Sequence, residues 1–318
     1  MRDCARWWHH DAVTYAHRQQ DGRSERHPLD VVAHRGASDE APEHTLAAYR
    51  KAIEDGADAL ECDVRLTADG HLVCVHDRRV NRTSNGRGAV STLELADLAA
   101  LDFGSWKATG SEPEAPDRDT ERAPGRAPDD PAVPTPGNLP GLAPGSGPDP
   151  DRTSVLTLER LLELVADSGR RVELAIETKH PTRWAGRVEE RLLTLLDRFG
   201  LAAPPRDDPS PVRIMSFSAR SLHRVQAAAP GLPTVYLMQF LTPRYRDGRL
   251  PTGVGIAGPS IRIVRNHPDY VARLRRAGHQ VHVWTVNEPE DVELCVRLGV
   301  DAVITNRPKA VLTQLGRR

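Results

Sequence analysis

The sequence has no long hydrophobic run, few aromatic residues and no excess of charge of either sign. No apolar stretch approaches the roughly eighteen residues of a membrane-spanning helix, and residues 1–29 lack an apolar core of signal-peptide length. We therefore expect a cytoplasmic protein without stable membrane insertion. The 43 Lys and Arg residues balance 44 Asp and Glu residues, and no basic stripe is interleaved with aromatic residues. These absences argue against a nucleic-acid partner, so any anion must be recognised locally.

Cysteine is also scarce. The four cysteines, Cys4, Cys62, Cys74 and Cys295, show no CxxC spacing, and two of them lie inside apolar, strand-like runs. This distribution favours buried free thiols in a reducing compartment. A disulfide between Cys62 and Cys74 is the alternative.

Two segments are too polar to build a core. Residues 1–29 show no sustained periodicity and indicate a flexible N-terminal extension. Residues 107–152 consist mainly of Pro, Gly and charged residues, which cannot bury enough surface to offset their ordering entropy. We interpret this second segment as a disordered, Pro-rich insertion within one domain that spans residues 30–318, because strand and helix patterns resume directly after it.

The rest of the chain alternates between strand-like and helix-like patterns. Helical spacings follow Thr45 and recur over 92–101, 156–165, 184–199, 221–229, 268–277, 290–298 and from Lys309. Eight strands are expected to start at Val31, Ala59, Val172, Val212, Thr234, between Ile256 and Ile263, at Val281 and at Ala302. Eight βα units predict an α/β fold of the (β/α)8 TIM-barrel type in a single domain. An open doubly wound sheet is the alternative, but no GxGxxG follows the first strand.

The first strand ends in an unusual group of residues. The apolar run Val31–Ala33 leads directly to His34, Arg35 and Gly36. A titratable ring, a fixed cation and a residue free to adopt positive φ belong at an exposed strand end rather than inside a sheet. The pattern indicates a strand that ends at a functional site, with Gly36 turning the backbone away.

Carboxylates close the next strands. Glu61 and Asp63 are two residues apart and so share one face of a strand, as do Glu177 and Lys179. Carboxylates that project together repel each other unless a cation lies between them, and oxygen-only ligands suit Mg²⁺ or Ca²⁺ better than zinc. The simpler alternatives are that Glu61 and Asp63 are solvated edge charges and that Lys179 merely pairs with Glu177.

A second histidine, His76, follows a short strand that a turn at Asp69-Gly70 precedes. Either histidine alone could be structural. The coincidence of both with Arg35, Lys179 and the carboxylates at the carboxyl ends of early barrel strands favours a site, because barrel enzymes place their chemistry there. An acid, a base, a Lewis acid and charged clamps suit phosphoryl transfer.

A series of short motifs carries a more specific signal. They are His34-Arg35-Gly36, Pro42-Glu43-His44-Thr45, Glu61-Cys62-Asp63-Val64, Asp69-Gly70, Val75-His76-Asp77, Thr83, Glu177-Thr178-Lys179, Ser216-Phe217 and Trp284-Thr285-Val286-Asn287. In this order and at these strand ends, the chain from Val31 to about Gln314, without the insertion, resembles the glycerophosphodiester phosphodiesterase family.

The resemblance implies a TIM barrel that hydrolyses a small-molecule glycerophosphodiester to sn-glycerol 3-phosphate and an alcohol, through a cyclic phosphate formed by the neighbouring glycerol hydroxyl. One divalent cation, Mg²⁺ or Ca²⁺ with Mn²⁺ as a third choice, is implied as the cofactor. The implied residues are His34 and His76 as acid and base, in an order left open; Arg35, Lys179 and Glu43 at the phosphate; Glu61, Asp63 and Glu177 at the metal; and Phe217 and Trp284 as candidate pocket walls.

Two other functions remain open at this point. The same site could cleave lysophospholipids, or a catalytically silent barrel could serve as a binding module. The chain also departs from the family pattern in three places: His44 replaces the usual Asn, Asn306 replaces the usual Asp, and the insertion after Trp106 is longer than the usual segment. The first departure predicts altered hydrogen bonding just behind the site. The second lies at a position expected to be structural. The third predicts altered access for bulky or lipid-like substrates.

Overall fold

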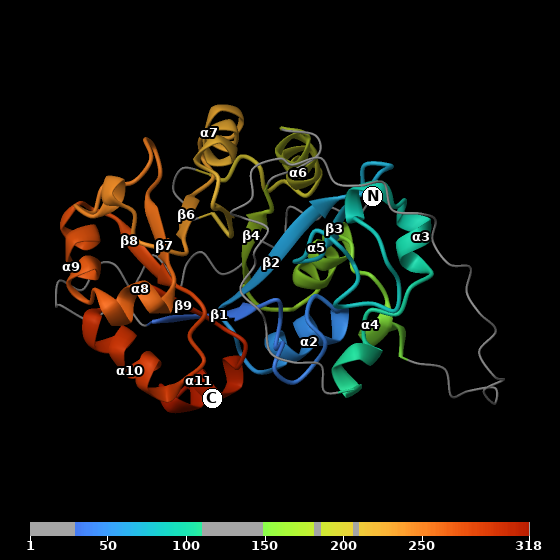
Figure 1. The fold of residues 1–318 in the computed structure, drawn as a ribbon, viewed down its shortest axis with the longest axis horizontal. Coiled ribbons are helices and arrows are strands. Elements are labelled where there is room, and N and C mark those ends of the chain that lie inside the picture. The colour runs from blue at the N-terminus through green and yellow to red at the C-terminus, as the bar shows by residue number, and fades with distance from the viewer. Residues whose placement is uncertain (1–28, 110–148, 181–185, 206–209, 318) are drawn as a thin grey trace.

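The fold is described from a computed structural model (Figure 1). It describes residues 29–109, 149–180, 186–205 and 210–317. The two segments predicted to be disordered therefore lie mostly outside the described residues. Of the insertion, residues 107–109 belong to a 3₁₀ helix and residues 150–152 to a short α-helix.

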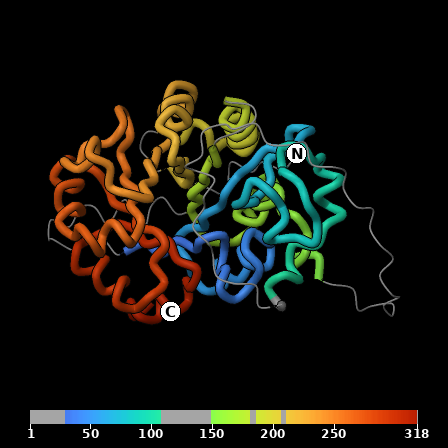
Figure 2. Tube along the Cα trace, in the orientation of Figure 1, coloured from blue at the N-terminus to red at the C-terminus, as the bar shows by residue number. Residues whose placement is uncertain are grey.

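Eight strands pair side by side in parallel, and the last pairs with the first, so the sheet closes into a barrel. The closure brings the N-terminal strand beside the C-terminal one, as the colours of Figure 2 show. This confirms the predicted (β/α)8 barrel. The barrel strands are β1 (Asp30–His34), β2 (Ala59–Leu66), β4 (Glu173–Thr178), β5 (Val212–Ser216), β6 (Thr234–Met238), β7 (Ile256–Pro259), β8 (Gln280–Val283) and β9 (Ala302–Thr305).

A ninth strand, β3 (Leu72–Cys74), extends the sheet as an antiparallel hairpin on β2. Its turn contains Gly70 with a φ of +90°, as the Asp-Gly signal predicts. Because β3 runs back along β2, it leads directly into His76 beside the carboxyl end of the barrel.

Helices surround the barrel (Figure 1). Their apolar faces pack on the outward-facing strand residues in two large clusters of buried side chains. The α-helices are α2 (Leu46–Glu54), α3 (Leu95–Ala99), α4 (Pro150–Thr153), α5 (Leu158–Ala166), α6 (Arg187–Arg198), α7 (Ala219–Ala228), α8 (Ile261–Asn266), α9 (Asp269–Arg276), α10 (Pro289–Leu298) and α11 (Pro308–Gln314), and the 3₁₀ helices are η3 (Val90–Thr92), η4 (Ser105–Thr109) and η6 (Pro243–Tyr245).

Two expectations about local structure are wrong. The strand expected between Ile256 and Ile263 ends at Pro259, and residues 261–266 form helix α8 instead. The connection between β6 and β7, for which the sequence gives no helical spacing, holds only η6, because its prolines and glycines break such spacing. The helix expected over 92–101 shortens to α3, since Glu94 is extended and caps it together with Asp97.

The barrel interior has an apolar middle and two polar ends. Alternation along the strands points one set of side chains inward, and these form a single apolar cluster that includes Val32, Ala175 and Met215. At the amino end of the strands, Arg213 donates to Glu173 at 2.7 Å. The carboxyl end carries the candidate site residues. The charged pair at the amino end was not anticipated from sequence.

The backbone turns sharply where β1 ends. Gly36 has a φ of +81°, and a Cβ added there would meet the backbone carbon of Ala48 at 2.6 Å. Arg35 and His44 also adopt positive φ, at 56° and 59°, which is uncommon for residues with side chains. Two hydrogen bonds hold the turn, from the Ala37 amide to the Ala48 carbonyl and from the His44 amide to the Arg35 carbonyl. The predicted role of Gly36 is confirmed.

The three described cysteines, Cys62, Cys74 and Cys295, are buried free thiols, which agrees with the first expectation and not with the disulfide. Cys4 lies outside the described residues.

We expect Gly36→Ala to lower the free energy of unfolding by about 2 to 3 kcal/mol, because it adds a steric clash to the strain of positive φ. Gly278→Ala is the matched control: its φ is +84°, but a Cβ there meets nothing within 4 Å, so it should cost about 1 kcal/mol. Urea unfolding of both variants measures the difference. Equal losses would remove the contact with Ala48 from the argument.

Candidate active site

The side chains singled out from the sequence converge at the carboxyl end of the barrel. All of them except Glu43 and Asp63 border a cavity of about 210 Å³, whose lining comes from strands on both sides of the ring. The lining residues are His34, Arg35, Glu61, His76, Glu177, Lys179, Met215, Phe217, Leu237, Gln239, Trp284, Thr285 and Ile304. One face of this cavity is charged and the other is apolar.

Three carboxylates meet on the charged face. Glu61 and Asp63 project from β2 and Glu177 from the neighbouring β4, where the register places Asp63 beside Glu177. One oxygen atom from each of the three lies within 4.8 Å of the other two, and all three residues are buried. Oxygens bound to one hard cation at about 2.0 to 2.5 Å would have this spacing. Among the described residues this is the one group of potential ligands so arranged.

Their mutual repulsion is visible in their ionisation. Burial and the Asp63 charge raise the pKa of Glu61 well above its ordinary value. Burial likewise raises the pKa of Glu177, to about 8, although Lys179 opposes this. Burial also acts on Asp63, but the charges of Lys179 and Arg35 outweigh it and hold the pKa of this carboxyl well below its usual range. Without a further cation, the cluster therefore carries protons at neutral pH.

Two permanently charged side chains, Lys179 and Arg35, already form ion pairs with the carboxylate cluster. The Lys179 ammonium lies 3.1 Å from an oxygen of Asp63 and 3.0 Å from one of Glu177. Arg35 places its Nε 3.0 Å from Asp63, and its backbone amide donates to Glu61 at 3.0 Å. Both cations also border the cavity, so each can face an anion there.

His34 is held by a neutral partner. Its Nδ1 lies 2.6 Å from Oδ1 of Asn306, which comes directly after β9. Because a carbonyl oxygen only accepts, Nδ1 carries the proton in this contact and Nε2 is left toward the cavity. Asn287 supports the arrangement by accepting from the Asn306 amide at 2.9 Å. The Nε2 atom is 4.0 Å from Glu61.

His76 has a charged partner. Its Nδ1 lies 2.7 Å from Oδ1 of Asp77, and the other oxygen of Asp77 accepts from Nε of Arg82 at 2.7 Å. Burial lowers the pKa of His76, as do the charges of Arg35 and Lys179. The two histidines thus differ in what stands behind them: an amide oxygen for His34 and a carboxylate for His76.

Glu43 faces other protein groups. Arg82 forms a two-pronged contact with its carboxylate at 2.9 and 2.7 Å, and Arg35 donates to it at 3.2 Å. Burial opposes ionisation, but the charges of Arg35 and Arg82 keep the pKa of Glu43 well below its usual range. Glu43 therefore holds two arginines in place.

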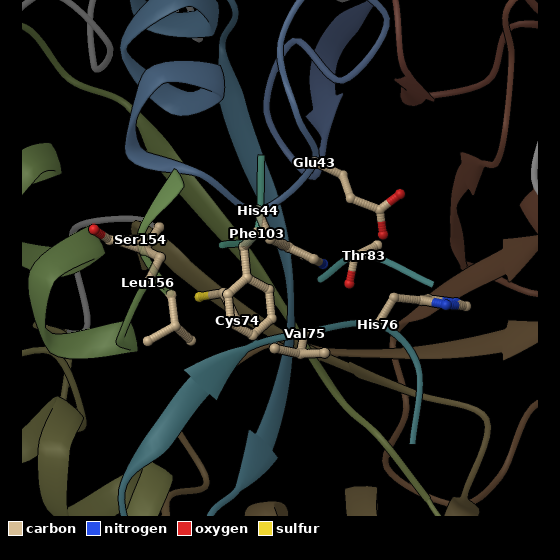
Figure 3. A pocket seen from close by; sticks show the side chains of 10 residues that line it. Glu43, His44, Cys74, Val75, His76, Thr83, Phe103, Ser154 and Leu156 are labelled. Atoms are coloured by element: carbon tan, nitrogen blue, oxygen red, sulfur yellow. The ribbon is translucent and has the colours of Figure 1, made fainter. Parts of the chain in front are cut away.

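A void of about 10 Å³ lies behind this network. Figure 3 shows Glu43, Thr83 and His76 on one side of it and Cys74, Phe103 and Leu156 on the other. A void of this size holds at most about one water molecule.

His44 lies at the departure from the family pattern noted above, and it hydrogen-bonds Asp63 at 2.9 Å and Tyr49 at 2.8 Å. His44 therefore lies directly behind a carboxylate of the cluster, and an altered hydrogen bond relative to the family's usual Asn stays a prediction.

The apolar face of the cavity is built around an aromatic pair. Phe217 follows β5 and Trp284 follows β8, and their rings meet edge to face with centroids 5.4 Å apart. The Trp284 indole donates to the Gly258 carbonyl at 2.7 Å, which fixes the ring. Leu237 and Ile304 complete this face. Both aromatic residues therefore line the cavity, at the positions where they were expected.

Most of the residues that the sequence assigned to the site lie around the cavity, but Glu43, expected at the phosphate, contacts Arg35 and Arg82 instead. Sequence reasoning also missed the supporting residues. Arg82 is one of four arginines between positions 78 and 87, and nothing in the sequence distinguishes it from the others. Asp77 was noted beside His76 without a role. Asn306 is predicted to be a structural position, and its contact is with His34, at 2.6 Å.

Fold and site together define a (β/α)8-barrel enzyme with an acidic cluster, two histidines and two cations around one cavity. Residues 34–310 match the model of the glycerophosphoryl diester phosphodiesterase family. A Mycobacterium tuberculosis protein named "Probable glycerophosphodiester phosphodiesterase 1" is 46% identical, over 89% of this chain and 90% of that protein. The glycerophosphodiester phosphodiesterase of Bacillus subtilis is 33% identical, over 87% and 83%. The chain belongs to the glycerophosphoryl diester phosphodiesterase family and is an enzyme of it.

Solved structures share the fold. An Oleispira antarctica phosphodiesterase, in complex with the product sn-glycerol-3-phosphate, superimposes with a TM-score of 0.65 at 23% identity, covering 90% of this chain and 96% of that one. A glycerophosphodiester phosphodiesterase from Agrobacterium tumefaciens gives a TM-score of 0.63 at 22% identity, covering 90% and 99%. None of the helices within the described residues has the length and apolarity to cross a bilayer.

Binding of a divalent cation to the carboxylate cluster should release protons. Glu61 and Glu177 have raised pKa values, to about 8 for Glu177, so both must lose protons before they can act as anionic ligands. Affinity for Mg²⁺ or Ca²⁺ should therefore rise as the pH approaches about 8, by up to roughly tenfold per pH unit for each proton released. Calorimetry in buffers of different ionisation enthalpy measures the release. Affinity independent of pH would contradict this ionisation of the cluster.

Proposed function

We propose that the protein hydrolyses glycerophosphodiesters to sn-glycerol 3-phosphate and an alcohol, with His34 and His76 as its acid-base pair. The observation that carries the proposal is the placement of both histidines, Arg35 and Lys179 around one cavity beside a cluster of three carboxylates. Family membership supplies the reaction class. The product bound in the Oleispira antarctica relative supports sn-glycerol 3-phosphate as the product here.

The donor set fits a hard divalent cation. Three buried carboxylates with close oxygens and raised pKa values on two of them form a site that gains from an added positive charge. Glu61, Asp63 and Glu177 would hold Mg²⁺ or Ca²⁺, with Mn²⁺ as a further choice. When bound, such an ion supplies positive charge to the phosphoryl oxygens.

Arg35 and Lys179 hold the phosphodiester anion. Both side chains are buried, and both border the cavity, so their charges act there with little screening from water. The anion in turn offsets the two charges that lower the pKa of His76. Substrate binding therefore favours the protonated form of His76, which Asp77 also stabilises.

His34 acts as the base in the first step. Its Nδ1 proton is engaged by Asn306, so Nε2 accepts the proton of the glycerol hydroxyl next to the phosphate. That hydroxyl oxygen forms a bond to phosphorus and gives a cyclic phosphate. The bond between phosphorus and the alcohol oxygen breaks, and His76 delivers its Nε2 proton to the leaving alcohol.

Water then opens the ring with the roles exchanged. His76, now neutral, takes a proton from a water molecule, and the water oxygen forms a bond to phosphorus. The bond between phosphorus and the ring oxygen that came from the hydroxyl then breaks. His34 returns its proton to that oxygen, which restores the glycerol hydroxyl and both histidines. The net reaction adds one water molecule across one phosphodiester bond.

Lysophospholipids are a second substrate class that one observation favours. The cavity wall opposite the carboxylates is apolar and aromatic, with Phe217 and Trp284 in edge-to-face contact. A wall of this kind can accept the first carbons of an acyl chain as well as a glycerol backbone. Turnover of glycerophosphocholine and lysophosphatidylcholine by the same preparation distinguishes the two classes.

The role assignment has a test that depends on the leaving group. We expect His34→Ala to lose at least about a hundredfold in turnover of both glycerophosphocholine and the p-nitrophenyl ester of glycerol phosphate, because both need a base. His76→Ala should lose as much with glycerophosphocholine. With the nitrophenyl ester it should still release nitrophenol, whose departure needs no proton, but it should leave the cyclic phosphate unopened and form little glycerol 3-phosphate. Product release is followed by glycerol 3-phosphate and nitrophenol assays.

His223→Ala is the control, since this histidine lies on the exposed side of α7. A reversed pattern between the two esters would exchange the roles of the histidines. Full activity of either site variant on glycerophosphocholine would remove that residue from the mechanism.

A further inference from the structure

We infer that Arg82 is a positioning residue for both His76 and Arg35. Its single guanidinium holds the orientation of the proton donor and of the residue that binds the phosphate. The inference rests on the proposed function. Arg82 lies outside the cavity lining, and none of the motifs discussed above assigns it a role. It stands in the loop after β3, between Val80 and Thr83, which are both buried.

Arg82 uses three nitrogens on two carboxylates. Its Nε donates to Asp77 at 2.7 Å, while Nη1 and Nη2 donate to the two oxygens of Glu43 at 2.9 and 2.7 Å. Each carboxylate also contacts a residue that lines the cavity. Asp77 uses its second oxygen for Nδ1 of His76 at 2.7 Å, and Glu43 accepts from Arg35 at 3.2 Å.

The network joins two loops that the fold otherwise brings to the cavity separately. His76 and Asp77 follow β3, whereas Arg35 and Glu43 belong to the connection between β1 and α2. Figure 3 shows Glu43 from the connection after β1 and His76 from the loop after β3 on the same side of the small void, with Thr83 between them. Arg82 spans the two loops, so a shift of either carboxylate displaces the guanidinium and, through it, the other carboxylate.

Only a guanidinium can make this arrangement. Its rigid fork offers one edge to Glu43 while Nε reaches Asp77, whereas a lysine has a single ammonium that cannot keep the same fixed geometry. The Arg82 side chain is 31% exposed, against 11% for Glu43 and 7% for His76. The charges are therefore partly shielded from water but remain outside the reaction space, as a supporting role requires.

The chain offers a matched pair of variants. Arg82→Lys keeps the charge and removes the fork, and Arg87→Lys makes the same change at an exposed arginine of the same loop. With glycerophosphocholine and saturating Mg²⁺ or Ca²⁺, we expect Arg82→Lys to lower kcat roughly 10- to 100-fold and to raise KM, as for other partners that orient functional side chains. Arg87→Lys should match the wild type.

Variants of one carboxylate at a time separate the effect on His76 from the effect on Arg35. Asp77→Asn weakens the contact to His76 and should act mainly on kcat, whereas Glu43→Gln weakens the contact to Arg35 and should act mainly on KM. When Asp77→Asn is added to Arg82→Met, kcat should fall by less than about a further twofold, because the contact between Arg82 and Asp77 is already lost. Fully multiplicative effects would show that Arg82 and His76 act independently and would overturn the inference.

Two further readouts do not require turnover. Calorimetric affinity for sn-glycerol 3-phosphate should fall in Arg82→Lys and Glu43→Gln but not in Asp77→Asn. Ring-nitrogen spectra of ¹⁵N-histidine-labelled protein should show His76 leaving its Nδ1-protonated form in Arg82→Lys and Asp77→Asn but not in Glu43→Gln. If wild-type protein hydrolyses no glycerophosphodiester, the proposed function fails, while these two measurements still decide the role of Arg82.

Thermal unfolding of every variant guards against a purely structural effect. If Arg82→Lys unfolds below the assay temperature, the test uses Asp77→Asn and Glu43→Gln instead. The first should then change mainly kcat and the second mainly KM. A folded Arg82→Lys with wild-type kcat, KM, product affinity and His76 spectrum would overturn the inference. So would equal effects of Asp77→Asn and Glu43→Gln on both kinetic constants.

Discussion

The constraint on which the site depends is the repulsion among three buried carboxylates. Glu61, Asp63 and Glu177 lie close enough for their oxygens to share a ligand, and burial alone would force all three to hold protons. Lys179 and Arg35 keep Asp63 ionised, but they are too few to ionise the other two. The barrel thus keeps a deficit of positive charge at the point where a phosphodiester and a cation would meet.

The supporting contacts follow from where the barrel brings its strand ends. Glu61 and Asp63 from β2 and Glu177 from β4 are adjacent because those strands pair directly. His34 reaches Asn306 because β1 pairs with β9, although the two residues are far apart in sequence. The different partners of the histidines, an amide for His34 and a carboxylate for His76, provide the asymmetry that a directional proton transfer needs.

Much of this could be predicted from the sequence. Strand periodicity placed the eight barrel strands, and residues two apart at strand ends placed the carboxylates and Lys179. What sequence could not provide were contacts that depend on loop conformation. The Arg35 amide donates to Glu61 at a turn where Arg35 adopts positive φ, and Arg82 reaches Glu43 across 39 positions of chain. Helix α8 was mistaken for a strand because Ile261, Ile263 and Val264 have strong β propensity, which tertiary packing overrides.

The most direct test of the account measures unfolding of wild-type protein and Glu61→Gln at neutral pH, with EDTA and with excess Ca²⁺ or Mg²⁺. The raised pKa of Glu61 costs stability above its unfolded-state value. Glutamine removes that cost together with a ligand charge. The account predicts that Glu61→Gln is the more stable protein in EDTA and that the metal stabilises the wild type more than the variant. Equal stabilisation of both proteins by metal, or of neither, would contradict it.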